Sequence, residues 1–188
     1  MDQKGMLLAH MELGNAFIGQ GMYEQAIDHF SKCATGFGPV DLVHAYNNLG
    51  VACTFLGRLD EAKVHLENAV RLADETAQPR SKAYALTSLA EVLIKTGSLA
   101  QAREHCFRSL EILTELDDKI GMSNAYANLA QAELASNDLT SSQEHCSESI
   151  SVLVGLDCPK TLEIRKKEYS KMMVEASAKD RDVHPKSD

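Results

Sequence analysis

Apolar residues recur through residues 5–155 at the three-to-four-residue spacing that places side chains on one face of a helix. In the stretch 40–74, Val43, Tyr46 and Leu49 share a face before Gly57, and Leu59 and Leu66 share a face after it. Glycine tolerates the left-handed backbone conformation found just past a helix end. The pattern therefore predicts an all-α chain in which helices are paired across tight turns.

The predicted pairs are copies of one another. A large apolar residue followed by a small one recurs at intervals of 36, 40 and 40 residues, as Leu13-Gly14, Leu49-Gly50, Leu89-Ala90 and Leu129-Ala130. The turn column stands eight positions after each leucine and holds Gly21, Gly57, Gly97 and Asn137. Repetition at this period is typical of a solenoid, in which a helix pair buries its apolar face by stacking on its neighbour.

These columns resemble the tetratricopeptide repeat, whose consensus Leu-Gly-x-x-Tyr and Ala-x-x-x-Phe is visible as Leu13-Gly14-x-x-Phe17 and Ala26-x-x-x-Phe30. The 40-residue intervals, with Asn-Ala-Tyr-Ala-Asn-Leu-Ala and Leu-Asp-Asp-Lys-Ile-Gly at the joints, are similar to those of the G-protein-signalling modulators of spindle orientation, kinesin light chains and rapsyn. The resemblance implies a right-handed α-solenoid of antiparallel helix pairs.

Four helix pairs are predicted within residues 1–157, at about 5–36, 40–74, 80–117 and 120–155. Cys158-Pro159 then interrupts the pattern, and residues 159–176 are interpreted as one amphipathic helix that caps the array. Residues 177–188 have no apolar period, so we expect them to be disordered.

Composition and charge narrow the classes of function. The 188 residues include 19 Lys and Arg against 27 Asp and Glu, a net charge of −8, and they contain no Trp. Nucleic-acid binding needs excess cations and aromatic stacking surfaces, so it is not expected. No stretch is apolar enough to span a membrane or to act as a signal peptide. Five cysteines without a Cys-x-x-Cys pair fit free thiols, which predicts a cytoplasmic protein.

One column is a candidate for catalysis or metal binding, and it holds His29, His65, His105 and His145. Equivalent residues of stacked helix pairs lie roughly 10 Å apart, too far to share one metal ion. The favoured interpretation is that these histidines are partly exposed helix residues beside small core cysteines. Because phosphate-loop, nucleophile-elbow and His-Glu-x-x-His motifs are also missing, we predict neither an enzyme nor a cofactor or metal site. A metal-dependent activity at the histidine column stays an alternative.

The resemblance implies that the first helix of each pair lines a concave groove that holds a peptide or helix of another protein. Transferring the family's lining columns gives Met11, Asn15, Asn47, Asn48, Tyr84, Thr87, Glu91, Asn124, Asn128, Gln131, Lys167 and Lys171. An amide offers both a donor and an acceptor, so a row of amides can pair with an extended backbone. Lys167 and Lys171 would attract an acidic ligand segment. The alternative is that these polar residues are merely solvated surface.

The predicted function is therefore a non-catalytic interaction module or adaptor. A second hypothesis is a scaffold that self-associates through its first helix pair, which would make the protein a homo-oligomer. The motivating residues are Met6, Leu7, Met11 and Phe17, because an uncapped solenoid end that exposes apolar side chains adheres to other copies.

Overall fold

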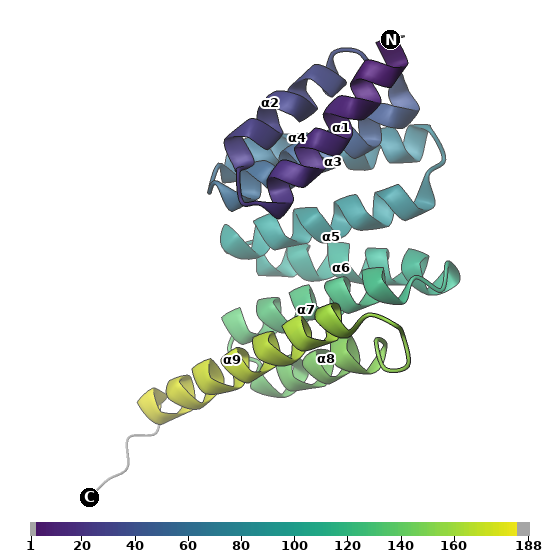
Figure 1. Cartoon of the computed structure of the whole chain (residues 1–188). Coiled ribbons are helices and arrows are strands. Elements are labelled where there is room, and N and C mark those ends of the chain that lie inside the picture. Colours follow the sequence, from purple (N-terminus) through teal and green to yellow (C-terminus); the bar gives the residue numbers. More distant parts are fainter. Residues whose placement is uncertain (1–2, 184–188) are drawn as a thin grey trace, which may run out of the picture. The chain divides into compact units, whose positions relative to one another are not determined.

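The computed structural model describes residues 3–183, which form nine α-helices and contain no strand (Figure 1). The chain divides into two compact units, Met1–Gly97 and Ser98–Asp188. The helices of the first unit are α1 (Gln3–Gly19), α2 (Tyr23–Ala34), α3 (Pro39–Phe55), α4 (Leu59–Glu75) and α5 (Pro79–Lys95). The helices of the second are α6 (Leu99–Glu115), α7 (Lys119–Ala135), α8 (Leu139–Ser151) and α9 (Pro159–Val183). No helix in the described part of the chain has the length and apolarity needed to cross a membrane.

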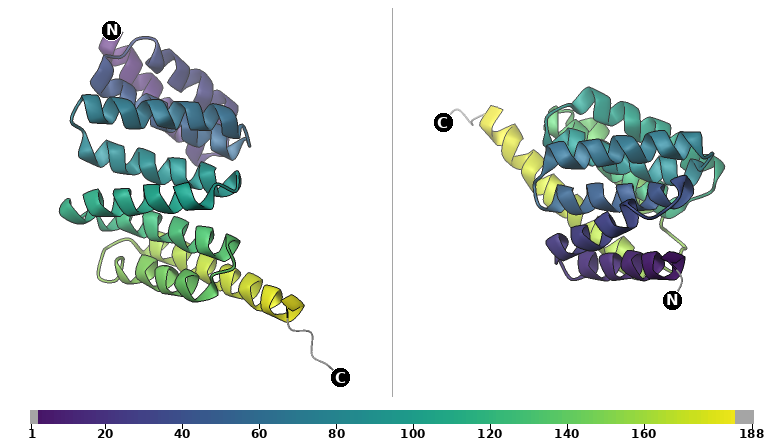
Figure 2. Two further views of the ribbon diagram at one scale, coloured as in Figure 1. Left: turned by 180° about the vertical axis from the view of Figure 1, so that it is seen from behind. Right: turned by 90° about the horizontal axis from the view of Figure 1, so that it is seen from above.

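In the first unit each helix packs against the next one in the sequence, and the first helices of the pairs also contact one another, α1 with α3 and α3 with α5 (Figure 2). The core between the first two pairs is formed by Ala26 and Phe30 of α2 with Leu49 and Ala52 of α3. The first helix of one pair is thus buried against the second helix of the pair before it. This is the stacking that the repeat predicted.

The left-handed turn column is confirmed. Its members have positive φ angles of 74° at Gly21, 74° at Gly57, 80° at Gly97 and 65° at Asn137. The turns between successive pairs also use this conformation, but at Ala77 (φ 52°) and Asp117 (φ 48°). The sequence did not mark these two positions, because alanine rarely adopts a left-handed backbone and aspartate adopts it far less readily than glycine.

In each of the first two pairs, a glycine on the first helix faces a large side chain on the second helix and allows the two helices to approach closely. A Cβ atom placed at Gly14 would lie 2.4 Å from the ring of Phe30, and one at Gly50 would lie 2.4 Å from Cγ of Leu66. In the third and fourth copies, alanine stands in the glycine column and cysteine in the column of Phe30 and Leu66. A smaller residue on the first helix of a pair therefore goes with a larger residue on the second helix, and a larger one with a smaller one. Close packing of the two helices requires this.

In the second unit α6 packs on α7, α7 on α8, and α9 on both α7 and α8. Ser123 of α7 and Ser149 of α8 are buried against each other, with each hydroxyl donating to the other residue's carbonyl oxygen at 2.7 and 2.9 Å. These bonds satisfy polar groups inside the fourth pair, where the sequence has serine in place of an apolar residue.

Two sequence-based expectations are wrong. Helix α9 does not end at residue 176 but continues to Val183, because its last two turns contain neither glycine nor proline; the rest of the expected disordered tail, 184–188, lies outside the described residues. The exposed apolar residues of α1 also differ from those expected. Leu7 is buried, and Met11 and Phe17 pack against the core cluster of α2 and α3, whereas Met6, Leu8 and Leu13 are exposed.

Because the side chain of Leu66 fills the space beside Gly50, we predict that substitutions at these two positions have coupled effects on the free energy of unfolding. Gly50→Ala should destabilise the protein by about 1 kcal/mol, because overpacking outweighs the usual gain of alanine over glycine in a helix. Combining it with Leu66→Cys recreates the residue pair of the fourth copy and should recover about 1 kcal/mol relative to the sum of the single changes. Urea denaturation of the four proteins measures this coupling.

Gly19→Ala is the matched control, since no atom lies within 4 Å of a Cβ at that helical glycine. It should stabilise by about 0.5–1 kcal/mol. If Gly50→Ala is as stabilising as Gly19→Ala, the close approach of α3 and α4 is not a constraint.

Candidate functional site

The residues expected to line a groove lie on the first helix of each helix pair, in both units, and on α9. In the first unit, α1 carries Met11 and Asn15, α3 carries Asn47 and Asn48, and α5 carries Tyr84, Thr87 and Glu91. In the second unit, α7 carries Asn124, Asn128 and Gln131, and α9 carries Lys167 and Lys171. Because α1 contacts α3 and α3 contacts α5, the first group shares one layer of helices.

The amides of α1 and α3 form a continuous run. Nδ2 of Asn48 donates to Oδ1 of Asn15 at 3.0 Å, and Nδ2 of Asn47 donates to Oδ1 of Asn48 at 3.4 Å. The Oδ1 atom of Asn47 is buried and has no hydrogen-bond partner among the described residues. A buried acceptor without a donor costs free energy, which a donor from a bound molecule could recover.

A cavity of about 270 Å³ opens beside this run, between α3 and α5. Its lining residues are Val43, His44, Asn47, Arg80, Ser81 and Tyr84. The cavity therefore combines an amide, an imidazole, a hydroxyl, a phenol and a guanidinium group around one apolar side chain. Such a set can hydrogen-bond to a peptide backbone and can also accept an acidic side chain at Arg80.

Other predicted groove residues of this unit are engaged within the fold. The Thr87 hydroxyl donates to the carbonyl oxygen of Ala83, one turn earlier in α5, at 3.0 Å. The Glu91 carboxylate pairs with Lys95 at 3.6 Å. Met11 packs against the core cluster, as described above. Within the described residues, the Oδ1 atom of Asn47 is thus a groove acceptor that the fold itself does not use.

In the second unit, Asn124 holds α9 in place. Its Oδ1 accepts a hydrogen bond from the guanidinium group of Arg165, which also bonds to the Ser123 hydroxyl at 3.3 Å and pairs with Glu168. Asn128 is buried and Gln131 half-buried, whereas Lys167 and Lys171 are exposed on α9. The sequence did not predict the role of Arg165, because nothing in its spacing identifies it as a partner of Asn124.

Three members of the histidine column, His29, His65 and His145, pack against aromatic side chains of the first helices. The His65 ring is stacked on Tyr46 at a centroid distance of 5.9 Å, and His29 lies 5.4 Å from Phe17. Burial lowers the pKa of both imidazoles, with His10 adding to the effect at His29. In the described part of the chain, no three His, Cys, Asp or Glu side chains converge so that they could hold a metal ion. The geometry is that of packing between the helices of a pair.

The cysteines are free, and four of the five are buried. Burial raises the pKa of the Cys106 thiol to about 12 and that of Cys146 to about 11, with the carboxylate of Glu133 contributing to both shifts. The pKa values of Cys33 and Cys53 are raised by burial as well. A nucleophilic cysteine needs a lowered pKa, so these thiols behave as small core residues.

The sequence-based interpretation missed a second concave surface, which lies in the second unit and is lined by glutamates of α6 and α8 together with aromatic rings. A signal was available, because Phe107, Glu111 and Glu115 follow one another at the four-residue spacing of a single helix face. The spacing alone does not identify a groove, because the facing residues Glu144, His145 and Glu148 come from α8.

Two segments of the chain match sequence models of the tetratricopeptide repeat, residues 43–76 and residues 81–153. Together the matched segments cover more than half of the chain. No curated protein matches the sequence.

Solved structures with a similar fold include BtubC (BKLC) from P. vanneervenii, which is 18% identical, with a TM-score of 0.70 over 88% of this chain and 70% of that one. A putative kinesin light chain from Podospora anserina with nearly identical TPR-like repeats is 16% identical, with a TM-score of 0.66 over 98% and 100% of the two chains. MamA from Desulfovibrio magneticus RS-1 is 14% identical, with a TM-score of 0.57 over 97% and 98%. At these identities the likeness establishes the fold, and it confirms the predicted all-α solenoid class.

The partly buried histidines predict how stability depends on pH. Because burial lowers the pKa of His29 and His65, the unfolded chain binds more protons than the folded one once the pH falls below about 6.5. Stability contributed by the neutral rings is therefore present above that pH and is lost as the pH falls. His65→Phe keeps a ring against Tyr46 and removes one titrating group, so it should flatten the decrease in Tm between about pH 7.5 and about pH 5.5. An equal decrease in the variant and the parent would contradict this account.

Proposed function

Because the chain belongs to the tetratricopeptide repeat family, we propose that this protein-interaction module works without catalysis, as an adaptor that binds an extended peptide or a helix through its first helices. The amide run of Asn15, Asn48 and Asn47, with its unpartnered acceptor beside a cavity, is the observation that carries the proposal. Tetratricopeptide repeats in general serve protein–protein interaction, which agrees with it.

The chemistry of the run suits an extended backbone. Successive peptide groups present N–H donors and C=O acceptors, and an amide side chain can meet either one. The side-chain Nδ2 of Asn15 and the side-chain Oδ1 of Asn47 lie at opposite ends of the run. Neither atom takes part in the two hydrogen bonds that connect the three amides. The adjoining cavity, with Arg80 and Tyr84 in its wall, would take one side chain of the ligand.

Within the second unit, the exposed Lys167 and Lys171 of α9 would attract an acidic ligand segment by charge. The five free cysteines support a reducing compartment, so we place the adaptor in the cytoplasm.

Removal of two amides tests the proposal. Peptides are first selected from a random-sequence display library on the purified parent protein. Asn47→Ala combined with Asn48→Ala should then weaken the selected peptides at least about tenfold, because the ligand backbone loses its partners. Binding is measured by fluorescence anisotropy, and circular dichroism verifies that the helices persist.

The matched control is Asn68→Ala, which removes an amide from α4, a second helix of a pair. It should leave binding unchanged. If the peptides bind the double variant as tightly as the parent, or if the control weakens them equally, the amide run is not the binding surface.

A second candidate function, self-association through α1, is favoured by one column of the repeat. Leu49, Leu89 and Leu129 are 3%, 4% and 0% exposed, and Leu49 packs against Ala26 and Phe30 of the preceding pair, whereas Leu13 is 46% exposed. No helix among the described residues covers this face of α1, which also carries the exposed Met6, seven positions earlier. A matching apolar helix from another copy could occupy it.

This candidate predicts a concentration-dependent increase in molar mass, detected by light scattering. Leu13→Glu should abolish the increase, because a charge would be buried in the contact. Val64→Glu introduces the same change at an exposed apolar residue of α4 and should have no effect. A parent protein that stays monomeric at high concentration would exclude self-association.

A further inference from the structure

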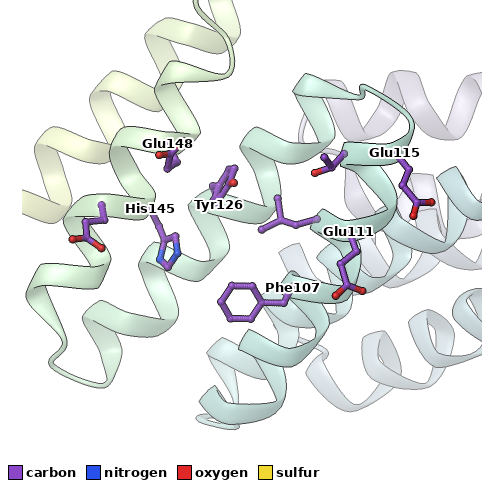
Figure 3. Close-up of a pocket in the computed structure, with 9 residues that line it drawn as sticks. Phe107, Glu111, Glu115, Tyr126, His145 and Glu148 are labelled. Atoms are coloured by element: carbon purple, nitrogen blue, oxygen red, sulfur yellow. The ribbon is translucent and has the colours of Figure 1, made fainter.

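The second unit contains a groove of about 730 Å³ between the second helices α6 and α8, with Tyr126 of α7 at its base (Figure 3). Apolar and aromatic side chains form its centre, and carboxylates surround them. The lining residues from α6 are Phe107, Leu110, Glu111, Thr114 and Glu115, and those from α8 are Glu144, His145 and Glu148. The groove uses helices other than those that carry the amide run.

Three rings form an ordered aromatic surface in this groove. The His145 imidazole is stacked on the Tyr126 ring, with a centroid distance of 6.0 Å and an interplanar angle of 23°. Phe107 meets the same imidazole edge-on at 6.3 Å and is 48% exposed to solvent. A 2.6 Å hydrogen bond between Nδ1 of His145 and the buried carboxylate of Glu133 fixes the imidazole. The rings are thus positioned before any ligand arrives.

The carboxylates around the rings lack cationic partners. Glu111 and Glu115 are one turn apart on α6, and Glu144 and Glu148 are one turn apart on α8. In the described part of the chain none of the four pairs with Lys or Arg, and Glu148 accepts only a 3.3 Å hydrogen bond from Ser151. Elsewhere the exposed glutamates Glu67, Glu75 and Glu91 each have a cation on their own helix. Mutual repulsion among four unpaired carboxylates is relieved when a cation enters the groove.

We propose that this groove binds an arginine-containing basic segment of a partner protein. A guanidinium group matches both parts of the surface, because its flat face stacks on aromatic rings and its five N–H donors reach carboxylates in pairs. A metal ion is the poorer match, since the described carboxylates do not converge on one point. The occupant is therefore a chain long enough to place cations along both walls while an aliphatic stem covers the rings.

The test uses a fluorescein-labelled peptide of alternating arginine and serine, about ten residues long, and a lysine peptide of the same charge. The parent protein should bind the arginine peptide saturably and at least about threefold more tightly than the lysine peptide. Glu111→Gln combined with Glu148→Gln should weaken the arginine peptide at least about tenfold, and Phe107→Ala about threefold.

Glu24→Gln combined with Glu67→Gln is the matched control, because it removes the same charge from α2 and α4 of the first unit. It should leave the affinity within about twofold of the parent. The proposal is overturned if the parent shows no saturable binding, if the two double variants lose affinity equally, if the lysine peptide binds as tightly, or if Phe107→Ala has no effect. The Asn47→Ala, Asn48→Ala protein should still bind the arginine peptide, so this test and that of the amide run can fail independently.

Discussion

The structure depends on one constraint, which is that a helix pair cannot bury its apolar face by itself. Leu49 of α3 becomes buried only because Ala26 and Phe30 of α2 lie against it. Leu13, at the equivalent position of α1, is half exposed because no described helix covers it. Stability in such an array is the sum of pair and neighbour terms, so each interface matters more than it would in a single globular core.

Close approach within a pair follows from the same constraint. Gly50 admits Leu66, and Gly14 admits Phe30, at a distance where any larger residue would separate the helices. Once the apolar faces of the inner helices are packed in this way, the polar groups that remain face solvent or line narrow surfaces between helices. The amide run on α1 and α3 and the acidic groove between α6 and α8 are both surfaces of this kind. Function in such a fold is a property of the remaining surfaces, not of the core.

The polar residues at the edge of the core show how packing changes their chemistry. His65 stacks on Tyr46, and the thiol of Cys146 has a pKa raised to about 11 by burial. Both belong to columns that could have indicated a metal or redox site. Their environments instead favour the neutral forms, and neutral rings and thiols pack as apolar side chains do. Arg165 illustrates the opposite case, since its bonds to Asn124 and Ser123 use polar groups to attach α9.

The sequence by itself determined the helix pairs, the turn column and the small-residue columns, because the tolerance of Gly57 for a left-handed φ and the small size of Gly50 are properties of the residue type and recur at a fixed spacing. It also placed Asn47 and Asn48 on one helix face. Only the tertiary structure decided that Asn48 bonds to Asn15, that Asn124 is taken by Arg165, and that Phe107, Tyr126 and His145 meet around one groove. The physical reason is that local periodicity fixes which face a residue occupies. The partner across that face comes from a helix distant in sequence and is selected by packing.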